Sequence, residues 1–174
     1  QDVDGSHIKG LLINMFHSLW PSLIKREGFM TSLATPIVKA FKGKKEKIFY
    51  NLTDYEDWRD SEANLNSWKI KYYKGLGTST SREAKDYFVD INDKLIHYFF
   101  KSAVDGIKPK PQMLEEDDDA ITLAFEKCRA DDRKKWLEKY DRNVIISYEE
   151  KKVQYSDFIH RELIHFSNDD LSRS

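Results

Sequence analysis

The sequence has a single cysteine, Cys128, among 174 residues. One cysteine cannot build an internal disulfide framework, and such scarcity agrees with a reducing compartment. A long apolar run is also missing, because the most apolar stretch, residues 8–23, is interrupted by Lys9 and Pro21. A helix that crosses a bilayer needs about 20 consecutive apolar residues, so this stretch predicts no membrane span. No signal-peptide pattern precedes it.

An excess of charge of either sign is absent as well. The chain has 29 Lys and Arg residues against 30 Asp and Glu residues, and its formal net charge is -1. Any binding to nucleic acid must therefore come from local basic patches. Hydrophobic residues make up 40% of the sequence and aromatic residues 13%, which is enough for a core in one domain or in parts of two.

Two aspartates separated by one residue, Asp2 and Asp4, open the chain just before a helix signal. In an extended segment their side chains would point to the same side and could hold a hard cation such as Mg²⁺. Capping of the helix that follows is the alternative. An EF-hand is excluded, because a loop with Gly5 in sixth place would need a glutamate where Leu11 stands. We expect the aspartate motif to be truncated at its N-terminal side.

Periodic patterns predict the first elements. Apolar residues at helical spacing predict an amphipathic helix that ends at Pro21. Its apolar side would consist of Ile8, Leu11, Leu12, Met15, Phe16 and Leu19. Residues 29–41 and 47–50 are strand-like, with a turn between them, and Thr53 with Glu56 could form a capping box.

A glycine-rich segment, residues 74–80, follows a strand predicted from the alternation of residues 68–73. Thr80 and Glu83 offer a capping box for a helix that reaches about residue 90. Such a strand-to-helix turn can bind phosphate through backbone N–H groups and the charge of Lys74. Lys74 precedes both glycines, so the segment is neither a Walker A loop nor a dinucleotide fingerprint, and a purely structural turn is the alternative.

The second half of the chain changes in character. Residues 101–119 predict a loop or linker that ends in an acidic run, which could bind cations or start a helix. Helical spacing follows from residue 121, and a further helix is predicted from Asp131, with basic residues on one side. Residues 145–155 are predicted to be extended, and Ser156 is predicted to cap the last helix.

Five motifs in one order and at matching separations resemble the eukaryotic type IIA DNA topoisomerases. They are residues 2–14, 35–39, 72–79, 131–137 and 155–167. The resemblance implies an α/β fold: a Toprim-like parallel sheet with flanking helices, then a helical connection and the first helix of a winged-helix domain. The corresponding expected boundaries are 1–100 for the later part of the Toprim domain, 101–119 for a loop or insertion, 120–150 for a helical connector and 151–174 for the winged-helix start.

The same resemblance implies a metal site and a DNA-binding side. Asp2 matches the middle aspartate and Asp4 the last aspartate of the family's D-x-D-x-D-G run, so both are expected to bind Mg²⁺, which Mn²⁺ or Ca²⁺ can replace. The residues expected on the DNA side are His7, Lys9, Lys74, Arg133 and Lys134.

The function implied by the resemblance is a share in transient double-strand cleavage and strand passage by an ATP-dependent enzyme. The nucleophilic tyrosine is expected beyond residue 174 and the ATP site elsewhere, so the chain holds no catalytic nucleophile and should be inactive alone. The implied partners are double-stranded DNA and a second copy of the protein, and the implied location is the nucleus. The alternatives are another Toprim protein, such as a primase or nuclease, and a non-catalytic module that binds DNA or protein.

Overall fold

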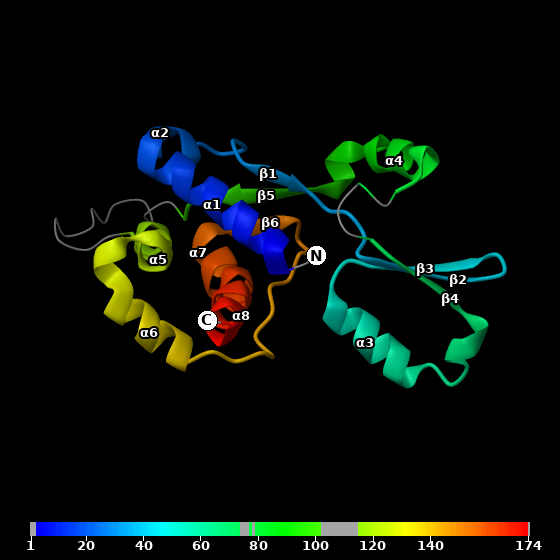
Figure 1. The fold of residues 1–174 in the computed structure, drawn as a ribbon. Helices are drawn as coiled ribbons and strands as arrows, with labels where there is room; N and C mark the ends of the chain where they lie inside the picture. The colour runs from blue at the N-terminus through cyan, green and yellow to red at the C-terminus, as the bar shows by residue number, and fades with distance from the viewer. Residues whose placement is uncertain (1–2, 74–76, 78, 102–114, 174) are drawn as a thin grey trace. The chain divides into compact units, whose positions relative to one another are not determined.

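The computed structural model describes residues 3–73, 77, 79–101 and 115–173, without the side chains of Val3, Asp4 and Arg173 (Figure 1). The chain divides into two compact units. The smaller unit contains Leu33–Leu95, and the larger unit combines Val3–Ser32 with Ile96–Ser174. Each unit is described by itself below.

The smaller unit is built on an antiparallel sheet of order β3-β2-β4. Its elements are β2 (Val38–Lys42), β3 (Lys45–Phe49), α3 (Leu52–Ser61), β4 (Lys69–Tyr72) and α4 (Ser81–Phe88), with 3-10 turns at Leu65–Ser67 and Ile91–Lys94. Strand alternation places Val38 and Ala40 on one face, and both pack in a core with Phe49, Tyr55 and Trp58. The predicted hairpin and the strand predicted over residues 68–73 are therefore confirmed.

The two helices of the smaller unit begin differently from each other. The Thr80–Glu83 capping box predicted for α4 is present, and the helix ends at Phe88. The capping box predicted from Thr53 is wrong, because α3 begins at Leu52 and its N-cap is Asn51, two residues before Thr53. The Asn51 side chain accepts a hydrogen bond from the Asp54 N–H at 2.8 Å, which leaves Thr53 inside the first turn.

The larger unit carries the second sheet, of order β1-β5-β6, in which β5 and β6 run parallel. Its elements are α1 (Val3–Leu19), α2 (Pro21–Ile24), β1 (Thr31–Leu33), β5 (Leu95–Phe99), α5 (Glu116–Phe125), α6 (Ala130–Glu138), β6 (Lys152–Gln154), α7 (Tyr155–Phe158) and α8 (Ile164–Arg173). A 3-10 turn, Lys127–Arg129, precedes α6, and a π-helical turn, Ile159–Leu163, joins α7 to α8. The core includes Ile13, Ile121, Tyr155 and Phe158. The expected mixed α/β fold with a parallel sheet is thus confirmed.

Helix α1 forms where predicted but buries a different face. The predicted apolar side is exposed, with Ile8 at 59% and Leu19 at 60% of their accessible surface. The buried side carries Ser6, Gly10 and Ile13 instead. A Cβ atom at Gly10 would lie 3.0 Å from Leu163 Cδ1, so glycine permits a close approach of the π-helical turn. The periodicity predicts the helix correctly, but the contact face combines the small residues Ser6 and Gly10 with Ile13, and most of the predicted apolar residues lie outside it.

The acidic run is helical rather than part of a loop. Helix α5 begins at Glu116, so the loop predicted over 101–119 is wrong for residues 116–119, and the alternative that the acidic run starts a helix is confirmed. Residues 102–114 lie outside the described part. Helix α6 lies where a helix was predicted from Asp131. The other domain boundaries predicted above stay predictions. In the described part of the chain, no helix is both long and apolar enough to cross a membrane.

Candidate nucleic-acid interface

Glu83 joins the end of β4 to the start of α4 in the smaller unit. Its carboxylate accepts hydrogen bonds from Lys71 Nζ at 3.1 Å, from the Thr80 N–H at 2.8 Å and from the Tyr73 hydroxyl. Lys39 Nζ lies 3.7 Å from the same carboxylate. Lys39 and Lys71 are cross-strand partners in the register of β2 and β4, so both amines point to the face that Glu83 meets.

These donors stabilise the ionised form of Glu83. They lower the pKa of its carboxyl group from 4.5 to about 2, the largest cause being the Thr80 backbone N–H and the next the Tyr73 hydroxyl. Burial and the adjacent Glu83 raise the pKa of Tyr73, which therefore remains a protonated donor at neutral pH. The result is a fixed negative charge surrounded by two lysines and a tyrosine.

Both ends of the glycine-rich segment are fixed by described contacts. At one end, the Tyr73 N–H donates to the Ile37 carbonyl at 2.8 Å, and at the other, the hydroxyl groups of Ser79 and Tyr87 lie 3.0 Å apart. Residues 74–76 and 78, Lys74 among them, lie outside the described residues. The predicted strand-to-helix connection is confirmed, whereas the assignment of Lys74 to DNA stays a prediction.

The paired-carboxylate geometry predicted for Asp2 and Asp4 does not hold at Asp4. Helix α1 begins at Val3, so Asp4 lies in its first turn and not on an extended segment. A carboxylate in the first turn is favoured by the helix dipole. Asp4 follows Val3, so it is not the N-cap of α1, and the capping alternative for Asp2 stays a prediction. Asp2 and the Asp4 side chain lie outside the described part, so their role as metal ligands stays a prediction. Among the side chains that are described, no group of three or more His, Cys, Asp or Glu residues could hold a metal ion.

His7 and Lys9, two predicted DNA contacts, are engaged within the larger unit. The His7 ring stacks on Phe166, with ring centroids 4.1 Å apart and planes 8° from parallel. Lys9 Nζ lies 2.7 Å from Glu162 Oε1, and only 18% of its side chain is exposed. Ser6 donates to the same oxygen at 2.8 Å. These contacts join α1 to the π-helical turn and the start of α8, a structural role that the sequence did not predict.

Arg133 and Lys134, on α6, differ in their surroundings. Arg133 donates through Nη1 to the Leu123 carbonyl at 3.1 Å and to the Glu126 carbonyl, so it satisfies free carbonyl groups at the end of α5. Lys134 is 76% exposed, and its ammonium lies 3.3 Å from Asp131. Of this pair, Lys134 is free to reach a phosphate group without breaking a buried contact, and the DNA role of both stays a prediction.

The sequence also missed a buried carboxylate, Asp117, in the acidic run. Its side chain is 1% exposed and accepts hydrogen bonds from the N–H groups of Lys101 and Ser156, at 2.7 and 2.8 Å. Ser156 was predicted to cap the last helix, which is wrong, because α7 begins at Tyr155 and Asp117 binds the N–H group of Ser156. Its neighbour Asp118 is bonded to His17 and Lys25 at 2.7 and 2.8 Å. Asp117 and Asp118 therefore hold segments of the larger unit together through hydrogen bonds, and the run is not a solvated cation site.

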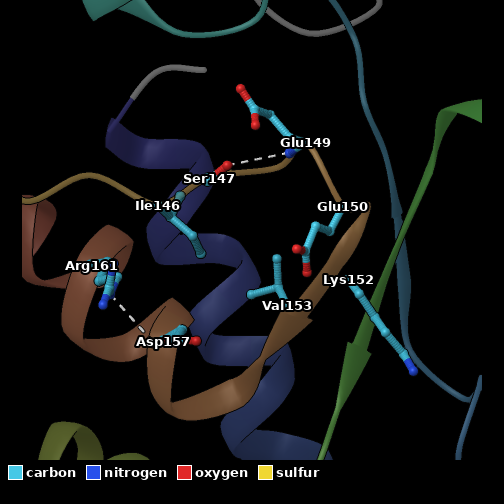
Figure 2. A pocket seen from close by; sticks show the side chains of 8 residues that line it. All are labelled: Ile146, Ser147, Glu149, Glu150, Lys152, Val153, Asp157 and Arg161. Atoms are coloured by element: carbon cyan, nitrogen blue, oxygen red, sulfur yellow. Dashed lines mark hydrogen bonds and ion pairs between the residues drawn. The ribbon is translucent and has the colours of Figure 1, made fainter.

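Figure 2 shows a polar hollow between β6 and the turn that precedes it in the larger unit. Arg161 is directed toward Asp157, with Nε and Oδ1 3.4 Å apart, and both side chains are about half exposed. Ser147 Oγ accepts a hydrogen bond from the Glu149 N–H at 3.4 Å. Charges of both signs line the hollow, and its Arg161 and Asp157 pair with each other, so we assign it no ligand.

Comparisons with known proteins identify relatives of the whole chain. The family described as the C-terminal associated domain of TOPRIM matches residues 33–171. DNA topoisomerase 2 of Plasmodium falciparum is 47% identical over 174 residues, and DNA topoisomerase 2-alpha of Gallus gallus is 46% identical over 186 aligned positions. Both alignments cover 100% of this chain but only 12% and 11% of the respective relative.

A solved structure is similar to the chain as well. It is the crystal structure of the Plasmodium falciparum topoisomerase II DNA-binding, cleavage and re-ligation domain, with a TM-score of 0.84 and 46% identity. The match covers 100% of this chain and 22% of that one. The chain thus corresponds to a small part of its relatives, while similarity extends along its entire length.

Proposed function

Since the chain belongs to the family of C-terminal domains associated with TOPRIM, we propose that it forms part of the DNA breakage-reunion core of a type II DNA topoisomerase. One observation carries the proposal: all of the chain aligns, at 46% identity, with a solved domain named for DNA binding, cleavage and re-ligation. The whole protein would be an ATP-dependent isomerase that acts on double-stranded DNA as a homodimer in the nucleus.

The proposed share of this chain in the reaction is to bind DNA and a metal ion. Asp2 and Asp4, which match two aspartates of the family's acidic motif, would hold Mg²⁺, because carboxylate oxygens are the ligands that this ion takes. When bound, Mg²⁺ neutralises charge on DNA phosphates. Lys74 and Lys134 would contact the DNA backbone, and Glu83 would keep the two ends of the Lys74 segment together.

The proposal assigns no nucleophile to the tyrosines of this chain. Burial is the main cause that raises the pKa of Tyr55, to about 12, and it also raises the pKa values of Tyr98 and Tyr155. A phenol with a raised pKa is a weaker source of the phenolate that attacks a phosphodiester. By the resemblance to the type IIA DNA topoisomerases, the tyrosine that becomes joined to DNA is proposed to lie outside residues 1–174, and ATP would also bind outside them.

Replacement of Asp2 tests the metal assignment. In the full-length protein, Asp2→Ala is expected to reduce Mg²⁺-dependent DNA cleavage by at least about 100-fold, because removal of charge stabilisation from a phosphoryl-transfer site costs about 10²–10³ in rate. Binding to DNA in the absence of Mg²⁺ should change less than about threefold, since no cation contact is removed. Cleavage is measured across a Mg²⁺ titration, and affinity by fluorescence anisotropy.

Wild-type cleavage by the Asp2→Ala protein at every Mg²⁺ concentration would exclude Asp2 as a ligand. It would favour the reading of the chain as a DNA-binding module without a metal. Asp54→Ala is a matched control, because Asp54 is an exposed aspartate in the first turn of α3, where it bonds to Asn51.

A further inference from the structure

The β2–β3 hairpin carries a concentration of positive charge that the proposed function does not use. Its four exposed lysines, Lys42, Lys44, Lys45 and Lys47, are called the hairpin lysines below. The connection is the two-residue turn Gly43-Lys44, where Gly43 has a φ of +60° that favours glycine. Strand β4 pairs with β2 only as far as Phe41, and β3 is an outer strand of the sheet. Within the described residues, neither edge of the hairpin tip therefore carries a further strand (Figure 1).

The register brings three of these charges to one face. Lys42 lies directly opposite Lys45, and Lys47 lies opposite Ala40, two positions further from the turn. Like charges that face each other across an antiparallel pair destabilise it. In the described part of the chain, no carboxylate forms an ion pair with a hairpin lysine. Glu46, the acidic residue of β3, points to the other face and lies 3.4 Å from Lys39.

Two tryptophans orient part of this charge. Lys42 Nζ lies 5.6 Å from the centre of the Trp68 ring, and Lys47 Nζ lies 5.4 Å from that of Trp58. The two indoles contact each other edge to face at 5.2 Å. A cation over an aromatic face is attracted without being neutralised, so both ammonium groups are held at the surface with their charge intact.

We propose that the hairpin lysines form a docking surface for the phosphate backbone of duplex DNA. The unrelieved repulsion between Lys42 and Lys45 would be offset by a dense polyanion, and duplex DNA carries one charge per about 1.7 Å of its axis. The basic residues here are all lysines, which bind phosphate as point charges, whereas bidentate recognition of a carboxylate favours arginine. The inference rests on the proposed function, because that function supplies duplex DNA as the ligand.

Charge neutralisation in the full-length protein tests the surface. The probe is a 40-base-pair duplex of mixed sequence, and its affinity is measured between 50 and 300 mM salt. The variant K42Q/K44Q/K45Q/K47Q is expected to show a slope of log affinity against log salt that is shallower by about 2–4, because each lost phosphate contact removes about 0.9. The variant K44Q/K45Q, which keeps both tryptophan contacts, should show about half of that change.

A matched control removes the same charge elsewhere. The residues Arg26, Lys127, Lys139 and Lys151 are exposed and lie outside the hairpin, and their joint replacement by glutamine is expected to change the slope by less than about 1. Equal slopes for the two quadruple variants would overturn the inference. A second pair of results would also overturn it: the wild-type protein binds a polyglutamate peptide more tightly than the duplex, and the hairpin variant keeps the wild-type DNA slope.

The test separates this inference from the proposed function. Affinity for the duplex does not require cleavage, so a shallower slope in a protein that binds DNA but never cleaves it would support the surface and overturn the topoisomerase assignment. Normal cleavage by a hairpin variant whose slope is unchanged would overturn the surface and support the topoisomerase assignment.

Discussion

Glu83 shows how one side chain fixes a larger segment. Its carboxylate meets Lys71 and Tyr73 at the end of β4 and Thr80 at the start of α4. The capping box between Thr80 and Glu83 could be predicted from their spacing, but the bonds from Lys71 and Tyr73 could not. Those bonds depend on how α4 packs against the sheet, which no local pattern encodes. The charged state of Glu83 is consequently a tertiary property.

Replacement of Glu83 tests whether its hydrogen bonds to the end of β4 and the start of α4 stabilise the fold. Glu83→Gln is expected to destabilise the chain by about 1–3 kcal/mol at pH 7, because it removes the charge from an acceptor of several hydrogen bonds. Since folding lowers the pKa from 4.5 to about 2, the stabilisation is complete above pH 4.5 and is lost as the pH falls toward 2. The difference in unfolding free energy between wild type and variant, measured with urea, should therefore shrink over that interval.

Glu46→Gln is the control for Glu83. Glu46 is 42% exposed and pairs with Lys39, one of the two lysines near Glu83. Its replacement should therefore lower the free energy of unfolding by less than about 0.5 kcal/mol. Equal losses in the two variants, or a difference that does not depend on pH, would show that Glu83 is an ordinary surface carboxylate.

At the scale of the elements, sequence patterns located most helices and strands but not their contacts. The alternation of residues 68–73 predicted β4, and apolar spacing predicted α1. The predicted apolar face of α1 is not the buried one, because apolar residues extend around much of the helix and periodicity alone does not select one side. Asp117 was missed for a related reason: four acidic neighbours share its type, and burial alone distinguishes it.

Gly10 is the residue that tests the observed face of α1. Gly10→Leu should destabilise the chain by more than about 1 kcal/mol, although leucine favours a helix, because its Cβ would lie 3.0 and 3.1 Å from atoms of Leu163 and Phe125. Ser18→Leu, at an exposed position of the same helix, should change stability by less than about 0.5 kcal/mol. Thermal unfolding of both variants is the measurement, and a Gly10→Leu protein as stable as wild type would show that Gly10 does not lie at a close contact.

At the scale of the whole molecule, the candidate site could be predicted only through resemblance. Spacing indicated a carboxylate pair and a glycine-rich turn, each with a structural alternative, and five motifs in order indicated one family. The family match over residues 33–171 confirms that identification. The contacts of individual basic residues could not be predicted from the sequence. Lys9, for example, pairs with Glu162, a residue distant in sequence that tertiary packing brings to it. Such long-range pairs depend on the fold and not on a motif.

The central claim is that this chain belongs to the core that breaks and rejoins DNA, without supplying the nucleophile. The most direct measurement is to trap the full-length protein on supercoiled plasmid DNA with Mg²⁺, denature it, and map the tyrosine that remains joined to DNA by mass spectrometry. We predict a covalent complex whose formation is lost in Asp2→Ala, with the joined tyrosine outside residues 1–174. Failure to form any covalent complex, or a link at a tyrosine within this chain, would contradict the claim.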